Sequence, residues 1–253
     1  EHNLQSLRIV DKLEERYGAF DGLNLMFETR AGILKHCAPA RARELGPVAE
    51  RFLADRRPTL EAQICNLADE IAYNNHDVDD GLRSGLIGLE EIGGVGLFAR
   101  HAGQARAEFP LLAGRRLIHE TVRRMIDAQV TDLLAETRKR IAQQGVVTAA
   151  DVTAAPPLVG FSAPMAADNR ALKHFLHTRL YRHHKVVRMT SRARRIVRDL
   201  FAAFADDVRL LPEPYQEKAA AEGTLRVVAD YIAGMTDRYA AKEHRRLFVI
   251  DET

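Results

Sequence analysis

The chain has 253 residues, of which 46% are apolar and 28% are charged, and its formal net charge is +2. This length suits one large domain or two small ones, and the composition is that of an ordinary soluble globular protein. No run approaches the roughly 18 consecutive apolar residues of a membrane-spanning helix, which excludes such a span, and no signal peptide is visible. The two cysteines, Cys37 and Cys65, form no CxxC pair, so we expect a reduced, cytoplasmic protein.

The first residues continue a helical pattern rather than begin one. Leu4, Leu7 and Val10 recur at helical spacing, and the chain opens on Glu1 without a methionine. We therefore expect the natural protein to begin further upstream.

The rest of the chain is also helical in pattern, because Ala, Leu, Arg and Glu dominate and strand-like alternation is rare. Thr59 is a candidate N-cap and Gly145 a candidate C-terminal cap. Residues 93–96 indicate a break, and residues 147–165 an irregular connection rich in Ala, Thr and Pro. We expect helices over 1–16, 27–36, 59–80, 115–144, 168–181, 186–205, 213–222 and 224–247. These elements predict a single all-α domain over 1–253, with any sub-boundary near 147–165.

The helix expected over 59–80 has two unlike faces. At about 100° per residue, Tyr73 and Asp77 fall roughly 40° and 80° from Asp69, and His76 falls about 20° to the other side. Apolar side chains gather on the opposite side, namely Leu60, Ile64, Leu67, Ile71, Val78 and Leu82. The pattern predicts a dry face and a separate face of carboxylates, an imidazole and a phenol.

Two interpretations of this polar face stay open. It is either the solvated side of a surface helix or the wall of a pocket where one carboxylate binds a metal while a tyrosine and a second aspartate hold a sugar hydroxyl. Tyr73 favours the pocket, since a solvated face seldom carries an aromatic residue. The dipeptide His76-Asp77 is by itself too weak a motif to indicate a metal site.

Residues 173–198 have the most unbalanced charge of any part of the chain. They include nine Lys or Arg and four His, but no Asp or Glu. Such a cluster needs an anionic partner, because its charges otherwise repel one another. A nucleoside triphosphate, a nucleic-acid backbone and an acidic face of a neighbouring subunit are the partners that stay open. Tyr181, which lies within the cluster, offers a ring and a hydroxyl to a nucleoside.

Several stretches that span nearly the whole chain carry a joint resemblance. They are residues 1–10 (EHNLQSLRIV), 21–25 (DGLNL), 58–63 (PTLEAQ), 67–73 (LADEIAY), 75–77 (NHD), 175–183 (FLHTRLYRH) and 230–237 (DYIAGMTD). In this order they resemble the bacterial HD-domain deoxynucleoside triphosphate triphosphohydrolases, the dGTPase-like proteins. Each stretch is modest alone, and together they are specific.

The resemblance implies an all-α fold, an HD-domain-type helical bundle with additional C-terminal helices. It also implies hydrolysis of dGTP or another dNTP to a deoxynucleoside and tripolyphosphate, by attack of a metal-bound water on the α-phosphorus. In the family, a divalent metal such as Mg²⁺ or Mn²⁺ is held by a His, a His-Asp pair and a later Asp, which Asp69 matches.

Further site residues are implied by the same resemblance. Tyr73 and Asp77 match residues that contact the deoxyribose, so His76-Asp77 is not the family's HD pair. His2 matches a catalytic histidine near the phosphates. The region that contacts phosphate and sugar is matched by Arg179 and Tyr181, with Arg182 and Lys185 beside them. The stretch 230–237 has no implied role, but its Ala233 and Gly234 suggest close helix packing.

The chain departs from the family in one respect. The family's first His and its His-Asp pair lie upstream of the position that His2 matches, so we expect three of the four protein metal ligands to be absent. Because a single carboxylate holds a catalytic metal poorly, we expect the 253 residues alone to be inactive or nearly so. Family members form oligomers, so we also expect a homo-oligomer.

Other functions stay open. The missing ligands suit a non-catalytic regulatory or oligomer-forming subunit, which would bind nucleotides without hydrolysing them. Residues 173–198 suit a protein that binds single-stranded nucleic acid, with an affinity that falls steeply with salt and survives Asp69→Ala. An HD-type phosphodiesterase fits the metal but explains the sugar-contacting residues less well.

Overall fold

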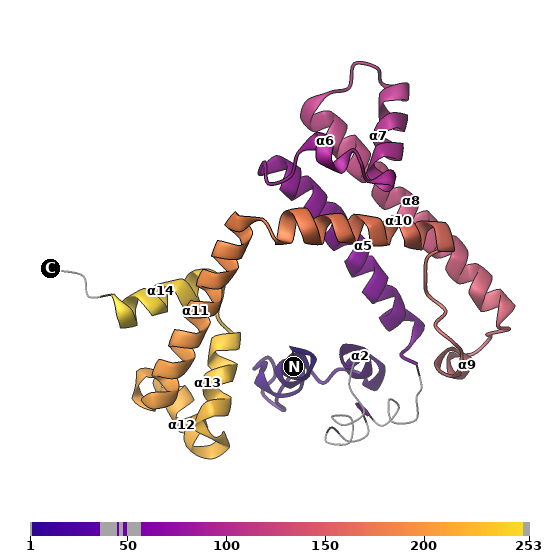
Figure 1. The fold of residues 1–253 in the computed structure, drawn as a ribbon. Helices are drawn as coiled ribbons and strands as arrows, with labels where there is room; N and C mark the ends of the chain where they lie inside the picture. The colour runs from indigo at the N-terminus through magenta and orange to yellow at the C-terminus, as the bar shows by residue number, and fades with distance from the viewer. Residues whose placement is uncertain (1, 36–44, 46–47, 50–56, 250–253) are drawn as a thin grey trace. The chain divides into compact units, whose positions relative to one another are not determined.

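The computed structural model describes residues 2–35, 45, 48–49 and 57–249 and divides into two compact units, residues 1–180 and 181–253 (Figure 1). Cys37 lies outside the described residues. The described residues are helical apart from turns, connections and the isolated bridges Glu15–Gly22 and Tyr17–Phe20. The predicted all-α class, a helical bundle with additional C-terminal helices, is therefore confirmed. No described helix is both long and apolar enough to cross a membrane.

The first unit is built around three packed helices, α5, α7 and α8. Its described elements are α1 (His2–Arg8), the π-helical turn η1 (Ile9–Leu13), α2 (Phe27–Ile33), α5 (Leu60–Arg83), α6 (Leu89–Ile92), α7 (Gly96–Glu108), α8 (Gly114–Gln143), α9 (Ala149–Ala154), α10 (Ala163–Phe175) and the π-helical turn η2 (Leu176–Tyr181), whose last residue begins the second unit. The helix α7 and the short helices α6 and α9 were not expected from the sequence. The pattern expected over 1–16 is interrupted, because η1 follows α1 and ends at Leu13.

The core of the first unit confirms the predicted dry face of α5. Ile71 and Val78 are buried in it, and Leu60, Leu67 and Leu82 pack against it in partly buried positions. Ile64 is the exception, with 38% of its surface exposed. Phe98 of α7 and Met125 of α8 fill the other side of this core. Burial of about 1.5–3 kcal/mol per large apolar side chain makes this face the main reason that α5 docks where it does.

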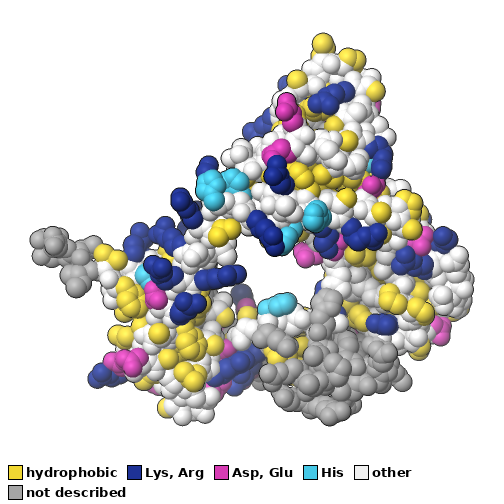
Figure 2. Space-filling view, viewed as in Figure 1, with side chains coloured by type: hydrophobic (Ala, Val, Ile, Leu, Met, Phe, Trp, Pro, Cys, Tyr) yellow, Lys and Arg dark blue, Asp and Glu magenta, His cyan; other side chains and the backbone are white. Residues whose placement is uncertain are grey.

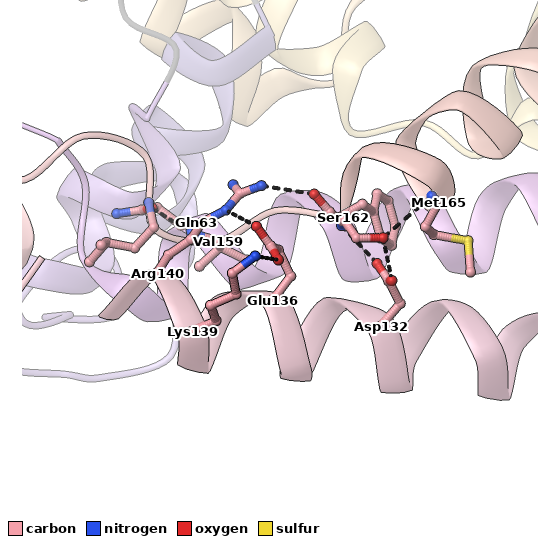
Figure 3. Close-up of polar contacts among 10 residues, drawn as sticks. Gln63, Asp132, Glu136, Lys139, Arg140, Val159, Ser162 and Met165 are labelled. Carbon is pink, nitrogen blue, oxygen red and sulfur yellow. Dashed lines mark hydrogen bonds and ion pairs between the residues drawn. The ribbon is translucent and has the colours of Figure 1, made fainter. Parts of the chain in front are cut away.

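Residues 158–162, inside the connection expected over 147–165, are tied tightly to α5 and α8 (Figure 3). Oε1 of Gln63 accepts from the backbone N–H groups of Leu158 and Val159 at 3.2 and 3.4 Å. Asp132 accepts from the backbone N–H of Ser162 at 2.9 Å and from its hydroxyl at 2.6 Å. The division between the two compact units falls at Leu180 and Tyr181. The single domain over 1–253, with any sub-boundary near 147–165, stays a prediction.

The second unit has its own core. It contains α11 (His184–Asp206), the 3₁₀ turn η3 (Val208–Leu210), α12 (Glu213–Glu222), α13 (Thr224–Ala233) and α14 (Asp237–Phe248). Leu200 and Phe204 of α11 pack with Val227 and Val228 of α13.

The single helix expected over 224–247 is two helices in the structure. Gly234 ends α13 as its C-cap, and the hydroxyl of Thr236 accepts from the backbone N–H of Tyr239 at 3.2 Å to begin α14. The close helix packing suggested for Ala233 and Gly234 is wrong, because both residues are exposed. Gly234 instead lies at the end of α13 in an ordinary right-handed conformation, with φ −79°.

Candidate functional site

The polar face of α5 is open to solvent in the structure. Thr59 is the N-cap, with its hydroxyl 3.4 Å from the backbone nitrogen of Ala62, as the sequence predicts. Asp69 is exposed, Tyr73 is 62% exposed and Asp77 is half-buried. The three side chains therefore share one side of a helix whose other side is anchored in the core.

This side of α5 borders α10 and η2. Glu70 accepts from Nδ2 of Asn169 at 2.6 Å and pairs with Nζ of Lys173 at 3.0 Å. Further along, a Cβ placed on Gly81 would lie 3.4 Å from Cδ1 of Leu180. The C-terminal half of α5 thus runs beside α10 and η2.

The side of α5 that packs against α10 and η2 lies close to the predicted site residues around the helix axis. Glu70, Asn74 and Gly81 fall roughly 100–140° from Asp69 at about 100° per residue. On the same scale Tyr73 and Asp77 fall roughly 40° and 80° away, so Asp77 is on the edge of the polar face nearest to α10 and η2.

Arg179 lies in the π-helical turn η2, within the same unit as Asp69, Tyr73 and Asp77. π-Helical turns are rare and occur often at functional sites. The flanking residues Leu176 and Leu180 are buried, whereas the side chain of Arg179 is 54% exposed and forms an ion pair with Glu91 of α6. The structure therefore brings an arginine onto the element that borders the polar face of α5.

Tyr181, Arg182 and Lys185 belong to the second unit. Tyr181 is 38% exposed, and Arg182 and Lys185 are exposed. Nδ1 of His183 accepts from the backbone N–H of Lys185 at 3.3 Å, which places Lys185 in the first turn of α11. Within this unit, a pocket of about 520 Å³ is lined by Tyr181, Val187, Thr190, Ser191, Arg194, Arg195 and Arg198.

The basic character predicted for 173–198 is concentrated on α11, where Lys and Arg side chains gather on the surface (Figure 2). Lys173 and Arg179 of the first unit are paired with Glu70 and Glu91. Further along the run, five arginines form no ion pair with any residue that the structure describes, namely Arg188, Arg192, Arg194, Arg195 and Arg198. The positive charge of α11 is thus available to an external anion.

His2 is exposed at the start of α1. Its neighbours Asn3 and Ser6 line a cavity of about 1060 Å³ together with Cys65 and other residues near the start of α5. Asp69 follows Cys65 by about one turn, so this cavity lies beside the part of α5 that leads into the polar face.

The described residues do not by themselves fit a metal. No group of three or more His, Cys, Asp or Glu side chains that could hold an ion is present among them. Asp69 offers one carboxylate, and a catalytic divalent metal needs several ligands in fixed geometry.

The sequence interpretation missed the polar residues that tie the site together. Asn74 and Asn169 are buried and bonded to each other, and Asn169 also donates to Glu70. Oε2 of Glu91 accepts from the backbone N–H of Gly88 at the start of α6. The ion pair of Glu91 with Arg179 joins residues 88 positions apart and has no local signal in the sequence.

Comparison with known proteins relates the chain to one family. Residues 159–246 match the phosphohydrolase-associated domain, a family named for its association with HD domains. A deoxyguanosinetriphosphate triphosphohydrolase-like protein from Thiobacillus denitrificans is 58% identical over 252 residues, which is 100% of this chain and 67% of the relative. Proteins of the same name from Ralstonia nicotianae and from an Azoarcus species are 59% and 60% identical, over 99% and 100% of this chain and 65% and 66% of their own lengths. The chain thus spans about two thirds of the length of these relatives.

Proposed function

We propose, since the chain belongs to the family of deoxyguanosinetriphosphate triphosphohydrolase-like proteins, that the protein hydrolyses a deoxynucleoside triphosphate to the deoxynucleoside and tripolyphosphate. In this proposal Tyr73 and Asp77 hold the deoxyribose. Arg179, Tyr181, Arg182 and Lys185 contact the phosphates and the sugar, and His2 acts near the phosphates. The substrate is dGTP or another dNTP.

One observation carries the proposal. The exposed phenol of Tyr73 and the carboxylate of Asp77 share one side of α5, and Asp77 lies at the edge of this side nearest to η2, the element that carries Arg179. A carboxylate accepts hydrogen bonds from sugar hydroxyls, and a guanidinium donates paired hydrogen bonds to phosphate. A nucleotide presents both groups within one molecule, and the arrangement has both partners in one unit.

The family also implies a divalent metal, with Asp69 as one ligand. Because the described residues do not complete such a site, the proposal rests on the groups that contact the nucleotide and not on the metal. That the 253 residues alone are inactive or nearly so stays a prediction, as do a cytoplasmic location and a homo-oligomer.

The test of the sugar contact is nucleotide binding by an Asp77→Asn variant, in the full-length product of the gene. Calorimetry should show weaker binding of dGTP and the other dNTPs than for the wild type, because the variant loses a charge-assisted hydrogen bond to the sugar. Asp80→Asn is the matched control, since Asp80 lies on the same helix and pairs with Arg83 on the surface. Equal affinities for the wild type and both variants would contradict the proposed sugar contact, and binding without hydrolysis would favour a regulatory subunit.

A second candidate function rests on α11. Its cations that form no ion pair with a described residue run from Lys185 to Arg198, a length of roughly 20 Å at 1.5 Å per residue. Such a length suits an extended polyanion, and single-stranded nucleic acid adds bases that can stack on Tyr181. We propose this as an additional binding activity of the second unit.

Fluorescence anisotropy with a labelled oligodeoxythymidylate checks this second candidate. The double variant Arg192→Gln, Arg195→Gln should bind more weakly and with a shallower dependence on salt, because each lost phosphate contact removes about one unit from the salt slope. Arg238→Gln, on exposed α14, is the control. No binding by the wild type, or the same loss in the control, would contradict the candidate.

A further inference from the structure

Glu91 meets Arg179 across two separate elements of the first unit. Oε1 of Glu91 on α6 contacts Nη2 of Arg179 on η2. We infer that Glu91 is a positioning residue, which holds the guanidinium of Arg179 in the orientation that receives a nucleotide phosphate. This inference rests on the proposed function and adds a residue that the sequence did not indicate.

Glu91 is itself held in place by the start of α6. Its other oxygen, Oε2, accepts from the backbone N–H of Gly88 at 2.8 Å. This hydrogen bond, together with Arg179, holds the pKa of the Glu91 carboxyl below its ordinary value, so the side chain is an anion at neutral pH. The next residue, Ile92, is fully buried in the core of the unit. A carboxylate with these attachments is a fixed point to which a flexible arginine can be bound.

Arg179 is suited to being held in this way. The buried side chains of Leu176 and Leu180 fix its backbone, while its own side chain is half exposed and reaches Glu91. Glu91 contacts Nη2, and a guanidinium has five N–H donors arranged as a planar fork. The contact with Glu91 therefore sets the orientation of the guanidinium, and its donors on Nε and Nη1 stay available to phosphate oxygens.

A purely structural role explains the pair less well. The side chains of Arg179 and Glu91 are 54% and 39% exposed, and exposed ion pairs contribute little to the free energy of unfolding.

A positioning role and a simple electrostatic effect predict opposite changes in nucleotide affinity for Glu91→Gln. If Glu91 only places a negative charge near the substrate, then Glu91→Gln removes a repulsion and the nucleotide binds more tightly. If Glu91 orients Arg179, the same change weakens binding, because the amide can still accept from Gly88 but no longer pairs with the guanidinium.

The experiment is a double-mutant cycle in the full-length product of the gene. The Kd of dGTP-α-thiophosphate, whose hydrolysis is slow, is measured by calorimetry for the wild type, Glu91→Gln, Arg179→Ala and the double variant. Glu91→Gln should weaken binding on the order of 3–10-fold in the wild-type background and by less than about twofold in the Arg179→Ala background. Glu90→Gln, a change at the adjacent exposed residue, should leave the Kd within about twofold of the wild type. Circular dichroism melts confirm that each variant is folded.

The outcomes separate this inference from the proposed function. Tighter binding by Glu91→Gln, or an equal loss with and without Arg179, overturns the positioning role while leaving nucleotide binding intact. A wild-type protein that binds no dNTP overturns the proposed function and the positioning role with it.

Discussion

Asn74 of α5 and Asn169 of α10 face each other in the interior of the first unit, although they are 95 positions apart in the chain. Nδ2 of Asn74 donates to Oδ1 of Asn169 at 3.3 Å, and Nδ2 of Asn169 donates to Oε1 of Glu70 at 2.6 Å. One buried amide thus joins α10 to two successive turns of α5. This link fixes the register of α5 against the element that continues into η2, and so it sets which residues of the two elements are neighbours.

Removing this amide should destabilise the protein. Asn169→Ala leaves buried Asn74 and partly buried Glu70 without their shared partner, so the free energy of unfolding should fall by about 1–3 kcal/mol. Urea denaturation measures the change. Arg170→Ala, at the neighbouring exposed position, should change it by no more than about 0.5 kcal/mol. Equal losses in the two variants would show that the amide link contributes no more to the free energy of unfolding than an exposed residue does.

Replacing either of two glycines with alanine should change the free energy of unfolding, but in opposite directions. A Cβ on Gly160 would lie 2.1 Å from Nη1 of Arg140, whose Nη2 donates to the carbonyl of Phe161 at 2.8 Å. Gly160→Ala must displace this guanidinium and should lower the free energy of unfolding by about 1–3 kcal/mol. Gly103 lies within α7 with no atom within 4 Å of its Cβ position, so Gly103→Ala should raise the free energy of unfolding by about 0.5–1 kcal/mol.

Thermal melts of the two glycine variants, side by side with the wild type, check both signs. A Gly160→Ala protein as stable as the wild type would mean that Arg140 is free to move away from Phe161.

Asp207 should titrate far below its ordinary range. Hydrogen bonds from the side chain and the backbone N–H of Arg209 lower the pKa of this carboxyl to about 2. Since the folded-state pKa lies below the ordinary value of 3.8, the contribution of Asp207 to stability is present above that value and is lost as the pH falls toward about 2.

Carboxyl chemical shifts measured by NMR against pH give the titration midpoint of Asp207 directly. Arg209→Gln should move the midpoint up toward the ordinary value, because the charged side-chain donor is the largest cause of the shift. Lys218→Gln, on α12, is a control that should not move it. A wild-type midpoint near 4 would contradict the hydrogen-bonded arrangement at η3.

Much of the fold could be predicted from local pattern. The dry face of α5 and its Thr59 cap follow from periodicity and capping chemistry, and the structure confirms both. The break between α13 and α14 was missed because the apolar pattern continues across Gly234. The anchoring of 158–162 was missed because it depends on Gln63, 95 positions away, and on Arg140.

For the candidate site, too, local sequence pattern predicts some features and not others. Tyr73 and Asp77 could be placed on one side of a helix from their spacing alone. The contact of Glu91 with Arg179 and the link from Asn169 to Glu70 could not, because such contacts depend on how helices pack and leave no periodic signal in the sequence. The roles assigned to the site residues come from the family resemblance and stay predictions, for His2, Asp69, Tyr73, Asp77, Arg179, Tyr181, Arg182 and Lys185 alike.

The central claim is that the protein releases tripolyphosphate from a deoxynucleoside triphosphate. The most direct measurement is tripolyphosphate release from each of the four common dNTPs with Mg²⁺ or Mn²⁺, for the full-length product of the gene and for its Asp69→Ala variant. The account predicts release by the wild type and a loss of at least about 100-fold in the variant, as expected when a catalytic metal loses a ligand. No release from any dNTP by the wild type would contradict the central claim, and release that is unchanged in Asp69→Ala would contradict the role of Asp69 as a metal ligand.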